Sequence, residues 1–239
     1  MTLFQDSENP IKHTTRPIVT GSTVIGVKFN GGVLVAADTL CSYGSTARFK
    51  NVCRLKTVGD NSILAAGGEF SDFQKLSNMI EELYEEGECY DDGAKMGPKE
   101  WASYITRVEY QNRSKMNPLW CSLILAGKQA GKTNLSYIDL HGTFFETDSF
   151  VATGLGAYMA IPLLRARWSE NMSLAEAKEV VSESLKICFY RDCRASNRIQ
   201  FGVCSDDGVC IEDPVELEHY WGHEAWTKPK LQSSTAATW

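Results

Sequence analysis

The chain has 239 residues, 43% of them hydrophobic and 23% charged, with a formal net charge of −6 at pH 7. This length permits one large domain with a self-sufficient core, and the acidic balance gives no indication of a nucleic-acid partner. No apolar run approaches the ~20 residues of a membrane-spanning helix, and the polar N-terminus lacks the apolar core of a secretory signal, so no membrane partner is predicted.

The eight cysteines are irregularly spaced and include no Cys-x-x-Cys pair, and the four histidines form no ligand cluster. The pattern therefore predicts no metal site and no cofactor. Without a secretory signal, the cysteines are expected to be free thiols in a reducing compartment.

The first regular element is a predicted hairpin. Val24 to Phe29 is rich in β-formers, and Val33 to Ala37 is a continuous apolar run, typical of a strand buried on both faces. Asn30-Gly31 between them is a strong turn signal. Antiparallel pairing would bring Ser22 and Asp38 to the same end of the sheet. They are either the polar ends of a core hairpin or a nucleophile paired with a carboxylate.

The rest of the chain alternates between groups of strands and pairs of helices. Residues 39–50 are rich in Ser, Gly and Tyr and are expected to form a loop. Further strands are expected at 52–58, 62–66, 120–127, 134–139, 143–147, 199–204 and 209–211. Helices are expected at 72–86, 98–114, 157–168 and from 174, where Ser173 and Glu176 form a capping-box pattern. Runs of strands with segregated helix pairs predict an α+β layered sandwich.

Several strings resemble the β-type subunits of the 20S proteasome, which are N-terminal-nucleophile hydrolases of the peptidase T1 family. These strings are Gly21–Phe29, Gly32–Asp38, Ala65–Gly68, Tyr190–Asp192 and Arg113–Trp120. The last of them is similar to a signature of the seventh β subunit of the ring. The resemblance implies a four-layer αββα sandwich, in which two antiparallel sheets are flanked by helix pairs.

The resemblance also implies a division of the chain. Residues 1–14 are expected to be a leader or propeptide, and residues 15–213 a single β-subunit domain that includes an N-terminal arm at 15–21. Residues 214–239 are expected to form a C-terminal tail that binds another subunit or is mobile.

Active members of the family use an N-terminal threonine, whose own α-amino group can take the proton from its hydroxyl. The nucleophile's position falls on Ser22, and the family's aspartate on Asp38. The family's lysine is replaced by Arg54, whose guanidinium stays protonated. The glycine that holds the oxyanion corresponds to Gly68, and a later aspartate to Asp192.

Two more positions depart from the family pattern, because Leu155 and Ala195 replace polar residues. The departures predict that the site is degenerate and that no residue is catalytic. Asp38 is instead expected to form an ion pair with Arg54. The alternative is an active N-terminal serine hydrolase that uses Ser22 after autolysis of the Gly21–Ser22 bond.

The resemblance implies that the leader is cut upstream, near His13, Thr14 or Thr15, so that Ser22 stays inside the chain. A non-catalytic subunit would contribute to the assembly of the β ring, in cytoplasm and nucleus. It would contact β subunits of the same and the opposite ring and subunits of the α ring. The candidate contact residues are Arg113, Ser114, Lys115, Asn117, Trp120, Trp221, Trp226 and Trp239.

Overall fold

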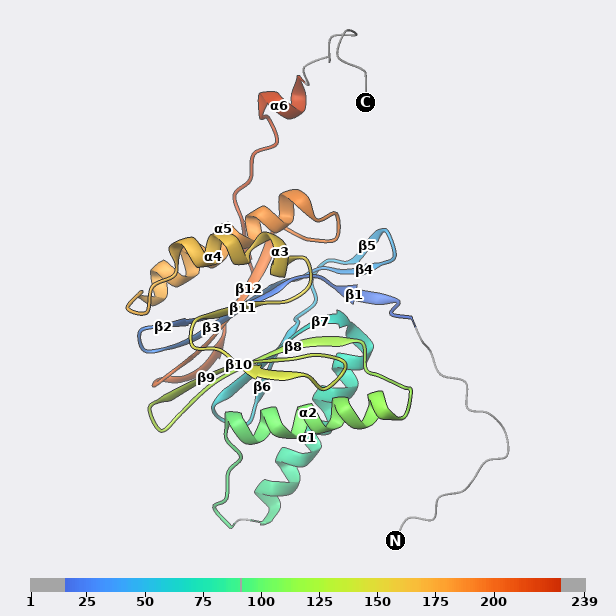
Figure 1. The fold of residues 1–239 in the computed structure, drawn as a ribbon, viewed down its shortest axis with the longest axis vertical. Helices are drawn as coiled ribbons and strands as arrows, with labels where there is room; N and C mark the ends of the chain where they lie inside the picture. Colours follow the sequence, from blue (N-terminus) through green and yellow to red (C-terminus); the bar gives the residue numbers. More distant parts are fainter. Residues whose placement is uncertain (1–15, 91, 229–239) are drawn as a thin grey trace, which may run out of the picture.

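The computed structural model describes residues 16–90 and 92–228. Two antiparallel sheets lie face to face, and helices cover the outer face of each, which gives the expected four-layer sandwich (Figure 1). Helices α1 (Phe70–Tyr90) and α2 (Pro98–Ser114) cover one sheet. Helices α3 (Gly156–Met159), α4 (Ile161–Arg167) and α5 (Leu174–Arg191) cover the other.

The first sheet has eight strands, and its longest strands lie at its centre. In spatial order they are β10 (Phe144–Glu146), β9 (Lys132–Ile138), β8 (Cys121–Gln129), β7 (Ser62–Glu69), β1 (Val19–Gly21), β4 (Cys41–Tyr43) and β5 (Thr46–Phe49), with β6 (Leu55–Val58) also paired to β7.

The second sheet contains the predicted hairpin at its centre. Its order is β11 (Phe150–Ala152), β2 (Val24–Phe29), β3 (Gly32–Asp38), β12 (Arg198–Ser205) and β13 (Gly208–Ile211), with β14 (Val215–Glu216) also paired to β12. Every residue of β3 is buried, as the apolar run predicts. Leu34 and Ala36 pack in the helix-covered layer, whereas Val33 and Val35 pack between the two sheets.

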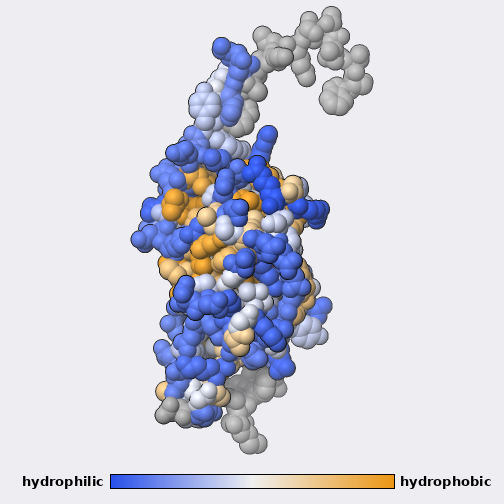
Figure 2. Space-filling model, turned by 90° about the vertical axis from the view of Figure 1, so that its left-hand side faces the viewer, coloured by the Kyte–Doolittle hydropathy of each residue, from blue (hydrophilic) through white to orange (hydrophobic). Residues whose placement is uncertain are grey.

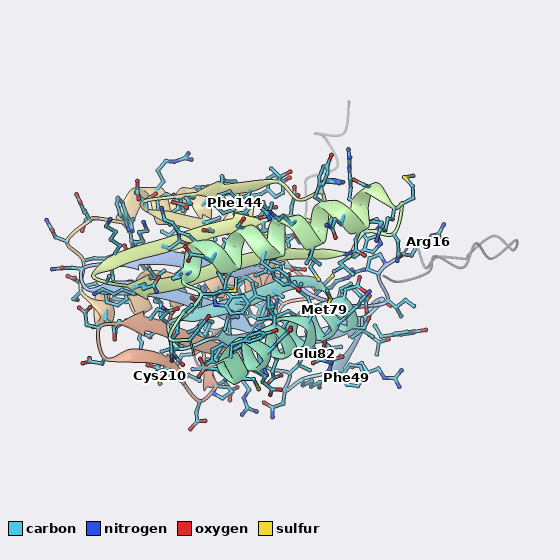
Figure 3. All side chains as sticks on the ribbon, turned by 90° about the horizontal axis from the view of Figure 1, so that it is seen from below. Arg16, Phe49, Met79, Glu82, Phe144 and Cys210 are labelled. Carbon is cyan, nitrogen blue, oxygen red and sulfur yellow. The ribbon has the colours of Figure 1, made fainter. Side chains whose placement is uncertain are left out.

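The helices on the two outer faces each bury an apolar stripe. Trp101 of α2 and Leu76 of α1 are buried against the first sheet, and Val181 and Leu185 of α5 against the second. Figure 3, seen from the α1–α2 side, shows α1 with Met79 and Glu82 labelled. Figure 2 shows hydrophobic residues gathered at mid-height of one face, between hydrophilic ends.

The start of α5 agrees with the sequence prediction and the start of α1 does not. The Ser173 hydroxyl accepts from the N–H of Glu176, and the Glu176 carboxylate accepts from the N–H of Ser173, which completes the capping box. Helix α1 begins at Phe70, two residues before the expected start at 72, and the hydroxyl of Ser71 in its first turn donates to the Glu69 carboxylate.

Two further local expectations were wrong. The segment 39–50 forms the β4–β5 hairpin instead of a loop, and α1 continues to Tyr90, past its expected end at residue 86. Strand β11 was not predicted. The first residues of the predicted tail pack on the body of the molecule. Strand β14 pairs with β12, and the Leu217 N–H donates to the carbonyl of Asn197.

The next part of the tail packs on the end of α5. The N–H of Tyr220 donates to the hydroxyl of Tyr190 at 2.8 Å, and the ring of Trp221 lies against the rings of Phe189 and Tyr190. The short helix α6 (Glu224–Thr227) then projects away from the body (Figure 1). Within the described residues, no helix is long and apolar enough to cross a membrane.

Candidate active site

The five positions that the sequence singled out lie together at one end of the two sheets. Ser22 lies between β1 and β2, and Asp38 ends β3. Arg54 immediately precedes β6, Gly68 is near the end of β7, and Asp192 follows α5. The chain crosses from the first sheet to the second at Ser22, and this crossing brings residues of both sheets into one site.

Arg54 is the most constrained residue of the site, with 2% of its surface exposed. Its guanidinium has five N–H donors, and each has an acceptor. Nε donates to the Asp38 carbonyl at 2.9 Å, and one terminal nitrogen donates to the carbonyls of Ser22 (3.1 Å) and Ala66 (3.0 Å). The other terminal nitrogen donates to the Thr23 carbonyl at 3.1 Å and to the Asp38 carboxylate.

The predicted ion pair between Asp38 and Arg54 is confirmed, and it is buried. The second oxygen of Asp38 accepts from the N–H of Ser196 at 2.9 Å, so both carboxylate oxygens have partners. Burial raises the pKa of Asp38, and the charge of Arg54 opposes that rise. Since each partner would be a buried unpaired charge without the other, the pair ties β3 firmly to the segment before β6.

Ser22 and Asp192 form a second polar contact. The Ser22 hydroxyl donates to one oxygen of the Asp192 carboxylate, and the other oxygen accepts from the N–H of Arg194 at 2.9 Å. Asp192 is itself buried. Within the described residues, no lysine or histidine forms a hydrogen bond with Ser22, so its hydroxyl has a carboxylate as its partner and not an amine or an imidazole.

The site has little free space around its backbone. A Cβ atom on Gly21 would lie 2.5 Å from Cδ of Arg54, because the arginine side chain fills that volume. Gly68 has φ = 89°, and a Cβ atom there would collide with the carbonyl of Trp120. Both positions therefore require glycine.

The segment before Ser22 is built into the first sheet. Strand β1 lies between β7 and β4, and Gly21 is paired with Gly68 on one side and with Cys41 on the other. The Glu69 carboxylate also accepts the N–H groups of Ile18 and Val19. The nitrogen of Ser22 is a peptide amide in this chain, and an amide is not a base near neutral pH.

Two threonines, to which the sequence prediction assigned no role, complete the site. Thr23 Oγ1 accepts from the N–H of Gly156 at 2.9 Å, and Thr153 Oγ1 accepts from the N–H of Val24 at 3.0 Å. They anchor the turn that carries Leu155, which is exposed. In the described part of the chain, no group of three His, Cys, Asp or Glu side chains could hold a metal ion.

The predicted contact residues fall into two regions that the structure does not bring together as one patch. At the end of α2, Arg113, Ser114 and Lys115 are exposed, whereas Asn117 and Trp120 are partly buried. Trp221 is half-exposed and packs on α5 of its own chain. Thr14, Thr15, His13 and Trp239 lie outside the described residues, as does the Trp226 side chain.

The two facing sheets, the helix layers and the Ser22 position at the sheet crossing define an N-terminal-nucleophile hydrolase fold. A family model described as proteasome subunit matches residues 18–204. The chain is 42% identical over 214 residues to proteasome subunit beta type-4 of Xenopus laevis, covering 89% of this chain and 88% of that protein.

Other relatives give the same result. Proteasome subunit beta type-4 of Arabidopsis thaliana is 38% identical, with 98% of this chain and 94% of that protein covered. Proteasome subunit beta type-7 of Saccharomyces cerevisiae is 35% identical, with 88% of this chain and 83% of that protein covered. The chain belongs to the proteasome subunit family, as a β subunit of the 20S core particle.

Proposed function

We propose that this chain is a non-catalytic, structural β subunit, and that other subunits of the particle carry out the proteolysis. The observation that supports the proposal most directly is that every N–H donor of the Arg54 guanidinium has an acceptor. A guanidinium has a pKa above 12, so it cannot exchange a proton with a neighbouring hydroxyl at working pH. With all five donors engaged, Arg54 acts as a structural cross-link.

The position of Ser22 gives a second, independent argument. The family's chemistry needs a free α-amino group beside the hydroxyl, with a pKa near 7.7–8. Strand β1, which directly precedes Ser22, is paired on both edges, with β4 and with β7. We propose that maturation cuts the chain near His13, Thr14 or Thr15, which would leave the Ser22 nitrogen as an amide.

The proposed role is to complete a β ring and to hold it to the opposite β ring and to the α ring. The exposed end of α2 around Arg113 and Lys115, and the tail beyond Trp221, are the proposed contact regions. We further propose that the subunit works in the cytoplasm and nucleus, where the particle degrades protein through its active subunits.

One alternative is an active serine hydrolase, and the hydrogen bond from the Ser22 hydroxyl to Asp192 favours it. The alternative requires autolysis between Gly21 and Ser22. The new α-amino group would then be the base, with Arg54 beside it.

The two functions are separated by N-terminal sequencing of the mature subunit and by labelling of the assembled particle with an electrophilic peptide probe. We expect an N-terminus near Thr14 or Thr15 and no label on this chain. A catalytic β subunit in the same particle is the positive control for labelling. A mature chain that begins at Ser22 and carries the probe would overturn the proposal.

A further inference from the structure

The β4–β5 hairpin projects from the body of the molecule beside β1 (Figure 1). We propose that this hairpin is a docking element for an acidic segment of a neighbouring proteasome subunit. This inference rests on the proposed structural role in the β ring, and it identifies one contact between subunits that this role requires. Phe49, the last residue of β5, lies at the periphery on the same side of the view as Arg16 (Figure 3).

The hairpin contains a bulge that aims one side chain. Cys41 is paired with Phe49, and the next residue, Ser42, is paired with Ala47. Arg48 is therefore the extra residue on β5. A bulge re-aims the side chain that it carries, and bulges are common at sheet edges where a strand meets something else.

Two aromatic rings hold the guanidinium of Arg48. Its central carbon lies 5.6 Å from the centroid of the Tyr43 ring and 5.4 Å from that of Phe49. Contact with two ring faces restricts the arginine side chain before any partner binds, and this lowers the entropy cost of binding. Arginine and tyrosine are also enriched among the residues that dominate binding energy at protein interfaces.

The charge of the hairpin is unbalanced. Residues 39–53 contain Arg48 and Lys50 and no acidic residue, in a chain whose net charge is −6. Among the described residues, neither cation forms an ion pair. An arginine at the surface pairs most strongly with a carboxylate, which it can hold with two hydrogen bonds.

The outer strand of the hairpin is an open edge. Strand β5 is the last strand of the first sheet and has all four residues exposed, and in the described part of the chain it pairs with β4 alone. An open edge offers backbone N–H and C=O groups that an extended segment of another chain can pair with. Two cations are too few to bind a nucleic acid or a membrane surface. An extended protein segment with a carboxylate opposite Arg48 would match both the open strand edge and the positive charge of the hairpin.

The test is assembly of the core particle with tagged Arg48→Glu, compared with the tagged wild-type chain, in cells that supply the other subunits. We expect charge reversal to reduce the fraction of the chain in assembled particles about tenfold or more, as for a central interface arginine. The matched control is Lys132→Glu, a reversal at another exposed cation without an ion pair among the described residues. It should assemble as the wild type does.

A photo-crosslinking residue in place of Thr46 identifies the occupant of the edge. The expected product joins this chain to another proteasome subunit at a peptide that contains Asp or Glu. Normal assembly of Arg48→Glu, or crosslinks to a peptide without a carboxylate, would refute the docking proposal. If the wild-type chain itself does not enter particles, the ring role fails instead, so the two failures are distinguishable.

Discussion

A buried carboxyl group in the α2 layer makes the stability of this subunit depend on pH. Glu109 of α2 is 0% exposed, and neither carboxyl oxygen has a hydrogen-bond partner among the described residues. Burial, and after it the negative charges of Asp72 and Asp139, together raise the pKa of Glu109 from 4.5 to about 8. The group is therefore a neutral acid at pH 7 in the folded chain.

The sign of the effect follows from proton binding. Between pH 4.5 and about 8, the folded chain holds a proton on Glu109 that the unfolded chain has released. The free energy of unfolding then falls by about 1.4 kcal/mol for each pH unit. The unfavourable contribution of Glu109 to the free energy of unfolding is about 3 kcal/mol at pH 7. It reaches about 5 kcal/mol near pH 8 and stays constant above that, where both states are ionised.

Replacing Glu109 with Gln keeps the shape and removes the titration. We expect Glu109→Gln to match the wild type within about 1 kcal/mol at pH 5 and to be more stable by about 3 kcal/mol at pH 7. Urea unfolding of the full chain at pH 5, 6, 7 and 8 measures the difference. Tryptophan fluorescence is a suitable probe, because Trp101 is buried in the same layer.

The control is Glu82→Gln, at an exposed position on α1. It should leave the pH dependence unchanged. If wild type and Glu109→Gln lose stability in parallel between pH 5 and 8, the argument from burial of a neutral acid is wrong.

Three other substitutions test the site and the fold. Arg54→Lys supplies three donors for five buried acceptors and should lower the free energy of unfolding by about 2–5 kcal/mol in urea, still without labelling by the peptide probe. Gly68→Ala places a Cβ atom against the Trp120 carbonyl at a positive φ and should cost about 2 kcal/mol or more, measured in the same way. Ser173→Ala removes the α5 cap and should lower Tm by roughly 2–4 °C in calorimetry.

The parts of the fold that the sequence predicts are those where burial and turn chemistry act together. The run from Val33 to Ala37 has apolar residues on both faces, and Asn30-Gly31 fixes the turn before it. Strand β5 is different, because it has only four residues, Thr46–Phe49, and all of them are exposed, so no buried face marks it in the sequence. An edge strand stabilised by backbone pairing leaves little trace in the sequence.

The site was predictable only at the level of its charged side chains. The pairing of Asp38 with Arg54 follows from opposite charges at two positions of a known pattern. The other acceptors of Arg54 include the carbonyls of Ser22, Thr23 and Ala66, and carbonyls are the same in every residue. Their role depends on how the chain crosses between the sheets, which no local pattern encodes.

The crossing of the chain at Ser22 has a mechanical consequence. Strands β1 and β4 belong to one sheet and β2 and β3 to the other, so the chain passes between the sheets twice at this end. Arg54 binds backbone at both passages, through Ser22, Thr23 and Asp38. At the opposite end the links are fewer: Lys128 donates to the Gly31 carbonyl and to Asp206, and the Cys204 thiol donates to the Ala126 carbonyl. Any opening of the sandwich should therefore pivot about Arg54 and begin at the Asn30-Gly31 turn.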